Sequence, residues 1–595
     1  MTITLPRLRF LAPLFAASVF CASALGGYFS SGSAGVLTAC FLLFLLTAAV
    51  RPTRREWGVG AIPAALFAFF RTVGYSYDTT DSSDLLLKNA QTMLRGAAAM
   101  AALFAAALCA VVLLFRLLDA LRAHTQSGAP ATQKEKRRLF WLCAGLIFAG
   151  SIPYLLLYAP GLNIYDTHDQ ILQFFGFPSY IGDGSALSDH HPVFLTLIYG
   201  GFMKLGLLLG DANIGQLLYS LLSMAALAAC WAYALVTLRE AGLARGAVIG
   251  LALFVALYPV LALYAFNMCK DVSVEPFVLL YGTMMFRLYA SHGRVAQSGR
   301  FCAGLFAVAL MMMLTRKPAM YALCFAALFL LLGYPGVRAR LAGALLGAAA
   351  VFAVLYNGLL LPALGVIPGE TREMLSVPFQ QTARFVSEYA SEVTDEERAA
   401  IDGVLVYDEL AKRYQPELSD PVKATYRKTA TPRDWLAYGQ AWASQMIRHP
   451  GCYLSATIIQ NALLFDVSTY NLAIFTGTGL SAQEEEALDI HRSGTLTRLE
   501  KMESSLRQVA LALPFVLQFN TLGFYCAVLL GACAIACSRK ARGMLTILLP
   551  QMLTMAVILC GPCIEHQDRY GFPVIYLMPL ALAALSCALR RTQRD

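Results

Sequence analysis

The stretch Tyr165–Phe194 holds the residues of this chain whose types and spacing are best suited to chemistry. It reads YDTHDQILQFFGFPSYIGDGSALSDHHPVF and lies between two strongly apolar segments. On a helical wheel, Asp166 and Asp169 fall about 60° apart, and Gln170 and Gln173 lie on the same face. Two neighbouring carboxylates perturb each other's pKa and suit a general base or a cation site. Asp166 and Asp169 are therefore candidate catalytic residues, and Gln170 is a candidate for positioning a substrate.

The opposite face of this predicted helix is apolar, with Ile171, Leu172 and Phe175. An amphipathic helix of this kind can lie in the membrane interface with its acids simply facing water, and that alternative stays open. His168 falls with the apolar group, so we expect it to pack in the interface rather than to bind a metal.

The motif SDHHP, at 188–192, allows two interpretations. Ser188 or Asp189 could cap the helix that follows, which requires no function. His190 and His191 could instead bind a metal or contact a phosphate. Both histidines are therefore candidate substrate-binding residues, and a divalent cation could serve as a cofactor.

Further charged residues recur at the predicted outer ends of apolar segments. They lie in three motifs: Lys270 and Asp271 in NMCKDV, Arg316 and Lys317 in LTRKPAMYA, and Glu565, His566 and Arg569 in EHQDRYGFP. Cations outside run against the usual bias of Lys and Arg towards the cytoplasm, so they need acids, lipid phosphates or an anionic ligand as partners. We expect the four basic residues to converge on one cavity and to bind a phosphate. The three others, Asp271, Glu565 and His566, are candidates for positioning the substrate.

The elements that must position these residues are membrane helices. The chain has 595 residues, of which 58% are hydrophobic and 14% are charged, and its mean hydropathy is +0.59. Soluble proteins carry about 25% charged residues. The composition therefore predicts an all-α polytopic membrane protein. The net charge of +9 is attributed to cytoplasmic loops and indicates no nucleic-acid partner.

Apolar segments of about 17–25 residues cross a bilayer as helices, and we identify about fourteen. They lie near 8–28, 34–50, 57–75, 95–118, 138–159, 213–237, 247–266, 272–290, 301–315, 318–334, 342–365, 520–537, 544–561 and 571–590. If the basic loops lie inside, both termini are cytoplasmic and four segments are outside: 76–92, 160–192, 366–450 and 563–570. Segments 193–210, 453–465 and 506–519 then lie at the outer interface as amphipathic helices, or dip into the membrane and return.

We divide the chain into four regions. Residues 1–137 form a four-helix membrane block that ends in a basic cytoplasmic linker. Residues 138–365 form a transmembrane core that contains the outer loop 160–192. Residues 366–519 form an extracytoplasmic domain with interfacial helices, and 520–595 carry the last membrane helices. The motif QQTAR in the third region makes Gln380, Gln381 and Arg384 candidates for substrate binding.

Seven motifs in order resemble an uncharacterised family of bacterial multi-spanning proteins that is grouped with the GT-C membrane glycosyltransferases. They are YDTHDQ, DHHPVFLTLIYG, NMCKDV, TRKPAMYA, SVPFQQTARFV, SDPVK and DRYGFPVIYLMP, and they cover about 138–590. The resemblance implies a GT-C-like core and an active site facing outside the plasma (inner) membrane. It implies transfer of a sugar from a polyprenyl-phosphate donor to a cell-envelope glycan, lipid or protein.

The same resemblance assigns the role of general base to Asp166, with Asp169 second. The protein mannosyltransferases of this class place Asp and Glu side by side, whereas TH separates the two acids here. Some members need a divalent ion and others do not.

The transfer reaction needs a base, cations and an apolar groove, and the motifs could supply all three. The sequence shows no glycine-rich motif that would bind a soluble nucleotide-sugar donor.

Two other functions remain as alternatives. A transporter or flippase of a lipid-linked sugar could use the same acids as proton sites, but charges within the spans are few and no internal repeat is visible. A structural scaffold would explain neither charged group.

Overall fold

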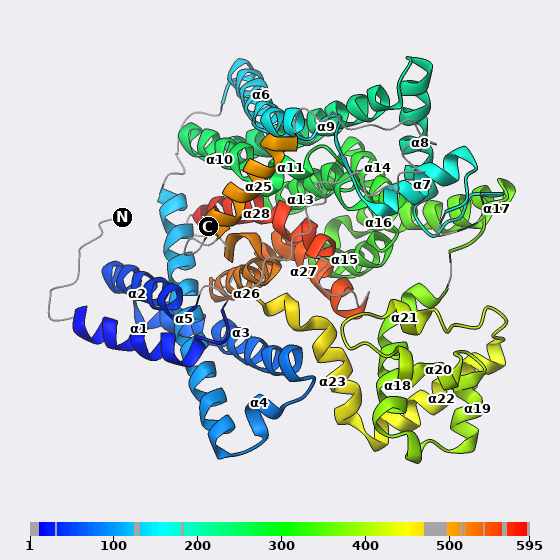
Figure 1. The fold of residues 1–595 in the computed structure, drawn as a ribbon. Helices are drawn as coiled ribbons and strands as arrows, with labels where there is room; N and C mark the ends of the chain where they lie inside the picture. Colours follow the sequence, from blue (N-terminus) through cyan, green and yellow to red (C-terminus); the bar gives the residue numbers. More distant parts are fainter. Residues whose placement is uncertain are drawn as a thin grey trace.

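Helices dominate the computed structural model (Figure 1). It describes residues 11–29, 32–123, 131–179, 182, 184–369, 371–468, 497–511, 516, 518–539, 542–561 and 568–591. Seven helices in these ranges are long and apolar enough to cross a membrane: Ser33–Val50, Arg54–Thr80, Ala90–Ala123, Gln133–Leu157, Ala212–Glu240, Pro335–Ala363 and Arg569–Leu589. Seven shorter apolar helices accompany them. The chain is therefore an all-α membrane protein, as its composition predicts.

The N-terminal block occupies one side of the molecule (Figure 1). Its helices are α1 (Leu11–Leu25), α2 (Gly32–Val50), α3 (Arg54–Thr80), α4 (Asp84–Leu87) and α5 (Ala90–Ala123). A capping box of Thr53 and Glu56 starts α3 and satisfies free N–H groups at that end. Buried Leu25, Phe67 and Leu103 belong to the core that joins the four long helices.

A larger hydrophobic core joins most of the remaining apolar helices. They are α6 (Gln133–Leu157), α9 (Ala212–Glu240), α10 (Arg245–Leu257), α11 (Pro259–Tyr264), α13 (Glu275–Ala290), α14 (Gly299–Thr315), α15 (Ala319–Gly333), α16 (Arg338–Ala350), α26 (Leu522–Ser538), α27 (Leu545–Cys560) and α28 (Phe572–Arg591). Helices α8 (Val193–Leu208) and α17 (Leu361–Ala363) contribute to smaller buried clusters. Helix α28 is apolar on most faces and is mostly buried inside this core, as expected of a helix without a polar side.

Two predicted spans differ from the structure. The segment 247–266 is broken into α10 and α11, because Pro259 has no N–H and shifts Tyr258 to an extended conformation with ψ 112°. The span predicted at 342–365 starts earlier, at Pro335, and contains a π-helical segment, Val351–Leu360, between α16 and α17.

A compact helical domain follows the α17 segment and lies beside the membrane helices (Figure 1). It contains α18 (Ser376–Glu388), α19 (Asp395–Asp402), α20 (Tyr407–Arg413), α21 (Asp420–Lys423) and α22 (Pro432–Arg448). Phe379, Ile401 and Tyr438 belong to its own buried core. Helix α23 (Pro450–Asn461) leads the chain back, and α25 (Thr497–Leu511) overlaps the interfacial helix predicted at 506–519, of which 512–515 and 517 lie outside the described residues.

Candidate functional site

A two-stranded parallel ladder organises the site. Strand β1 (Leu162–Asn163) pairs with β2 (Asn267–Met268), and each leads into a short helix, α7 (Tyr165–Phe175) or α12 (Lys270–Ser273). The Thr167 hydroxyl donates a hydrogen bond to the Met268 carbonyl and ties the two turns together. The ladder therefore brings the first turns of α7 and α12 side by side.

Five charged residues meet at these turns, and we name them the ion-pair cluster: Asp166, Lys270, Asp271, Arg316 and Arg569. Lys270 Nζ lies 2.8 Å from Asp166 Oδ2, and Arg569 Nη1 lies 3.2 Å from the same oxygen. Arg569 Nε lies 3.8 Å from Asp271 Oδ2, and Arg316 Nη2 lies 3.4 Å from Asp271 Oδ1. Four segments far apart in sequence thus share one charged network.

The cluster is buried, which strengthens its electrostatics. Asp166 is 6% exposed, Asp271 0% and Arg569 3%. Burial alone would raise the pKa of Asp166, but Lys270, Arg569 and His191 outweigh it and hold that pKa well below its usual range. These neighbouring side chains therefore supply the charges that keep Asp166 ionised.

The two histidines stand next to the cluster. His191 Nδ1 lies 3.2 Å from Lys270 Nζ, and the His190 and His191 rings meet edge to face with centroids 4.7 Å apart. Burial, together with the charge of Lys270, holds the pKa of His191 well below its usual value, so it is neutral at pH 7. Among the described residues no group of three His, Cys, Asp or Glu side chains could hold a metal ion.

A second ion pair lies beside the histidines. Lys317 Nζ is 2.8 Å from Asp189 Oδ2 and also donates to the Asp189 backbone carbonyl. Burial lowers the pKa of Lys317 against the opposing effect of Asp189, and the charge of Lys270 lowers it further. The structure thus brings Lys317 within electrostatic range of the cluster. All four predicted cations are gathered, each with a carboxylate partner.

The polar face of α7 does not face water. The Gln170 amide donates to Thr196 Oγ1 (3.1 Å) and to the Pro192 carbonyl (3.3 Å), and Gln173 Oε1 accepts from the Ser188 N–H (2.9 Å). The amides therefore hold the segment before α8 against α7. The wheel grouped these residues correctly, but their partners are protein groups rather than water or substrate.

Three smaller expectations at this helix also change. His168 is buried, with Nε2 2.8 Å from Asn163 Oδ1, so it belongs to the ladder and not to an interface. Pro192 occupies the N-cap position of α8 in place of Ser188 or Asp189, although the Val193 N–H interacts with the Asp189 carboxylate. Asp169 is only partly buried, in contrast to Asp166.

The predicted residues of α18 have other partners. The Gln380 amide donates to the Gln415 carbonyl (2.6 Å) within the helical domain. The Gln381 amide donates to Thr457 Oγ1 (2.9 Å), and Arg384 Nη1 lies 2.5 Å from Asp81 Oδ1. All three side chains are buried, and only Gln381 and Arg384 connect the domain to neighbouring elements. Glu565 and His566 lie outside the described residues.

An apolar groove of about 1260 Å³ runs between α15 and α27, and sequence patterns did not locate it. Pro318 and Cys560 line it at one end, and Tyr334 and Leu545 line it at the other. The Tyr334 and Thr546 hydroxyls, 3.3 Å apart, join the two helices at that second end. The groove thus follows the full length of α15, about 22 Å.

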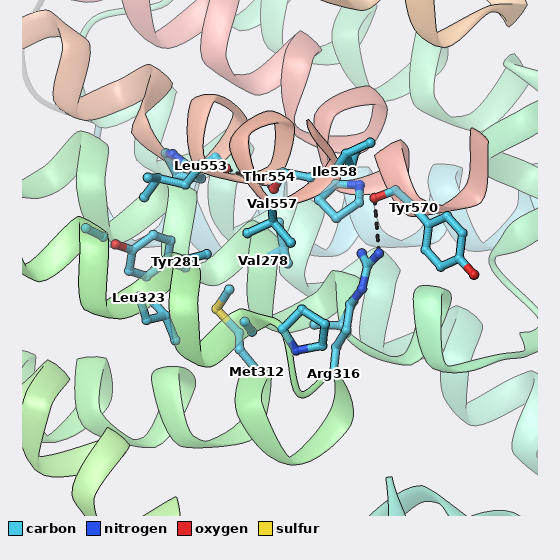
Figure 2. A pocket seen from close by; sticks show the side chains of 17 residues that line it. Val278, Tyr281, Met312, Arg316, Leu323, Leu553, Thr554, Val557, Ile558 and Tyr570 are labelled. Atoms are coloured by element: carbon cyan, nitrogen blue, oxygen red, sulfur yellow. Dashed lines mark hydrogen bonds between the residues drawn. The ribbon is translucent and has the colours of Figure 1, made fainter. Parts of the chain in front are cut away.

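A smaller cavity connects this groove to the cluster. It holds about 60 Å³ and shares Pro318, Ala322, Leu553 and Val557 with the groove. Arg316 and Tyr570 line its far side, where Arg316 Nη2 donates to the Tyr570 carbonyl (3.1 Å), as Figure 2 shows. Apolar space therefore leads directly to a cation of the ion-pair cluster.

These features define a polytopic membrane protein with a buried ion-pair cluster at one end of an apolar groove. The chain belongs to a family of unknown function, DUF6020, whose model matches residues 181–595. The matched range contains Lys270, Arg316, Lys317, Arg569 and both histidines, and it begins after Asp166. No curated protein and no solved structure matches the chain.

Proposed function

We propose that the protein is a GT-C type glycosyltransferase that moves a sugar from a polyprenyl-phosphate donor to a cell-envelope acceptor. The observation that carries the proposal is the small cavity that joins the groove to Arg316. A lipid tail requires an apolar groove, and the phosphate at its end requires cations. Arg316, Lys270, Arg569 and Lys317 would bind the phosphate. Lys270 and Arg569 pair with Asp166, Arg316 pairs with Asp271, and Lys317 lies within electrostatic range of Lys270.

In the proposed reaction, the acceptor hydroxyl oxygen attacks the anomeric carbon of the sugar. The bond from that carbon to the phosphate oxygen breaks, and polyprenyl phosphate leaves with the bonding electrons. The cations stabilise the charge that develops on the phosphate. Asp166 takes the proton of the hydroxyl, and Asp169 on the next turn positions the acceptor.

Donor binding would itself prepare Asp166. A carboxylate whose pKa is strongly lowered is a weak base, and Lys270 and Arg569 cause that lowering in the free protein. A donor phosphate that draws these cations away would raise the proton affinity of Asp166. The base is therefore strengthened only when a sugar donor is in place.

The proposed membrane arrangement has fourteen spans in the plasma membrane, with the cluster outside. Basic segments assigned to the cytoplasm contact one another: Arg539 pairs with Asp119 at 3.0 Å, and Arg116 pairs with Glu56 at 2.8 Å. Lys136, near the first residue of α6, pairs with Glu240. The ion-pair cluster lies beyond the opposite end of α6. This division into two sets of helix ends supports the orientation that the charge bias predicts.

A flippase of a lipid-linked sugar is the second candidate, and the length of the groove favours it. The groove is lined at both ends of α15, so a lipid could in principle move along the whole helix. Such a protein would use the cluster to bind the headgroup without breaking a bond. Product formation separates the two candidates.

The test uses membranes containing the full chain and a panel of radiolabelled polyprenyl-phosphate hexoses, with cell envelope as acceptor. Wild type should form labelled product. Asp166→Asn keeps the size of the side chain but removes its basicity, so it should abolish transfer, whereas Asp169→Asn should only reduce it. Normal turnover by Asp166→Asn would exclude this base. Lipid movement without product in wild type would support the flippase.

Donor binding supplies the matched test of the cations. Lys270→Ala should weaken binding of the labelled donor by about 1.5–3 kcal/mol, the contribution of one charged hydrogen bond. Lys204→Ala is the control, because Lys204 is exposed on α8. Equal affinities of the two variants would argue against a phosphate at the cluster.

A further inference from the structure

Helix α15 carries aromatic side chains along the groove at a regular spacing. Its three aromatic residues, Tyr321, Phe325 and Phe329, all line the groove that separates it from α27, and the two helices lie side by side (Figure 1). They are four residues apart, so each ring follows the previous one after about 6 Å of helix. The side chains are 47%, 59% and 54% exposed, so part of each ring is open to a ligand. We name these three residues the aromatic ladder.

The ladder belongs to the groove and not to the whole lipid-facing surface of α15. Leu328 and Leu332 are also exposed on this helix, but they do not line the groove in the part of the chain that the structure describes. The opposite wall, on α27, is aliphatic and includes Leu549, Met552 and Ala556. A ligand in the groove therefore has aromatic rings on one side and smaller, flexible side chains on the other.

The ladder begins at the end of the groove that leads to the cations. Tyr321 follows Pro318, which lines both the groove and the small cavity that reaches Arg316. The Tyr321 hydroxyl donates to Met374 Sδ at 3.4 Å, which connects the first ring to the segment before the helical domain. A lipid whose phosphate is bound near Arg316 would therefore extend its tail past the three rings in order.

The spacing of the ladder suits an isoprenoid chain. One isoprene unit contributes four carbon–carbon bonds along the chain and extends by about 5 Å, close to the step between rings. Each unit contains a flat double bond that can lie against a ring face. Because that bond does not rotate, an isoprenoid tail loses less conformational entropy on binding than a saturated chain of equal length.

We propose that α15 binds about the first four isoprene units of the lipid donor, one unit for each turn of helix, and that the rest of the tail stays in the bilayer. The proposal rests on the proposed function, in which the donor is a polyprenyl phosphate. A groove of about 22 Å has room for about four units of 5 Å. The fourth position of the ladder is Gly333, where an added Cβ would meet no atom within 4 Å. Three units therefore contact rings, and the fourth faces a gap.

Binding of lipid phosphates to the full chain in nanodiscs tests the ladder. Geranylgeranyl phosphate has four isoprene units, and hexadecyl phosphate is a saturated chain of the same backbone length with the same headgroup. Both tails leave an apolar bilayer, so the difference in affinity reports contact with the groove rather than removal from water. Wild type should bind geranylgeranyl phosphate about tenfold more tightly, because only its units match the rings.

Two double variants assign this preference to the rings. Phe325→Leu with Phe329→Leu keeps both positions apolar but removes two rings, so the preference should fall to about twofold. Leu328→Ala with Leu332→Ala is the matched control, because these side chains are exposed on α15 outside the groove, and it should keep the wild-type preference. Equal affinity of wild type for the two lipids would overturn the ladder, as would an equal loss in both double variants.

A series of chain lengths tests the limit of about four units. Affinity should rise from two to four isoprene units and then level off, and a continued rise with longer chains would overturn the limit. Gly333→Phe supplies a fourth ring, so it should strengthen binding of geranylgeranyl phosphate but not of farnesyl phosphate, which has three units. Sugar transfer by wild type without a preference for isoprenoid tails would overturn the ladder alone. Selective binding of isoprenoid phosphates without any transfer would support the ladder and overturn the proposed enzyme.

Discussion

Two aspartates of the site, Asp166 buried and Asp189 partly buried, show how partners decide a charge at the residue scale. Asp166 has two cations within 3.2 Å, and its pKa falls despite burial. Burial raises the pKa of Asp189, and this effect exceeds the opposing effect of its ion-pair partner Lys317. The same side chain type is therefore firmly ionised in one place and easier to protonate in the other. Of these two aspartates, Asp166 is the one that stays ionised against the cluster cations in the absence of ligand.

His191 should make the protein less stable in weak acid. Its pKa in the folded protein lies well below 6.5, so below that pH the unfolded state binds a proton that the folded state does not. The stabilisation is present above pH 6.5 and is lost as pH falls. Between pH 7.5 and 5.5, wild type should lose up to about 1.4 kcal/mol per pH unit more than His191→Asn.

Thermal melting in detergent at several pH values measures this difference. Using the difference between the two proteins removes the slopes of all other groups. His292→Asn is the matched control, because His292 is exposed and Asn tolerates its positive φ of 51°. Equal slopes for wild type and His191→Asn would mean that folding does not lower the pKa of His191.

At the scale of elements, the sequence predicted helices well and their partners poorly. Long apolar runs identify membrane helices because crossing a bilayer requires a minimum length. The β1–β2 ladder has two residues in each strand, too few for any periodic pattern. A helical wheel groups Asp166, Gln170 and Gln173 but cannot tell a protein partner from water. For this reason α7 was expected at an interface and lies buried against 188–196 instead.

The sequence likewise predicted some residues of the candidate site and missed the partners of others. The bias of Lys and Arg towards the cytoplasm made Lys270, Arg316 and Arg569 stand out, and the structure brings them together. Arg384 was expected near a ligand because of its motif, but a motif does not reveal its ion pair with Asp81 on another domain.

The groove between α15 and α27 can be tested as an element by filling it. Ala556 lines the groove on α27, so Ala556→Trp should block a lipid tail and weaken binding of the polyprenyl-phosphate donor at least tenfold. Leu559→Trp is the control, because Leu559 is exposed on the same helix and does not line the groove. A photoreactive polyprenyl phosphate provides the measurement. Equal crosslinking of both variants would place the tail elsewhere.

At the scale of the whole molecule, the proposed orientation predicts which loops are accessible. Lys412→Cys in the helical domain should react with an impermeant maleimide applied from outside. Ser298→Cys, in the basic loop 287–300, should react only after permeabilisation. Both positions are exposed, so access and not burial decides the result. Labelling of residue 298 from outside would reverse the orientation and place the cluster in the cytoplasm.

The N-terminal block lies outside the matched family range, yet one buried ion pair fastens it to the rest of the molecule. Arg71 on α3 lies 3.0 Å from Asp466, which follows α23, and both side chains are almost fully buried. Arg71→Met should destabilise the protein by about 3–5 kcal/mol because it leaves a buried carboxylate unpaired. Replacing both partners, as Arg71→Met with Asp466→Asn, should cost less, since no lone charge remains.

Thermal melting in detergent can rank these variants against an exposed pair. Arg398 and Asp408 are 2.8 Å apart and mostly exposed, so Arg398→Met should cost less than about 1 kcal/mol. The expected order of melting temperature is Arg398→Met highest, then the double variant, then Arg71→Met. If Arg71→Met melts at the same temperature as Arg398→Met, the Arg71–Asp466 pair does not hold the block to the rest of the molecule. If the predicted order is found, the block depends on a charge pair with the segment that returns from the helical domain, and the two parts fold as one unit.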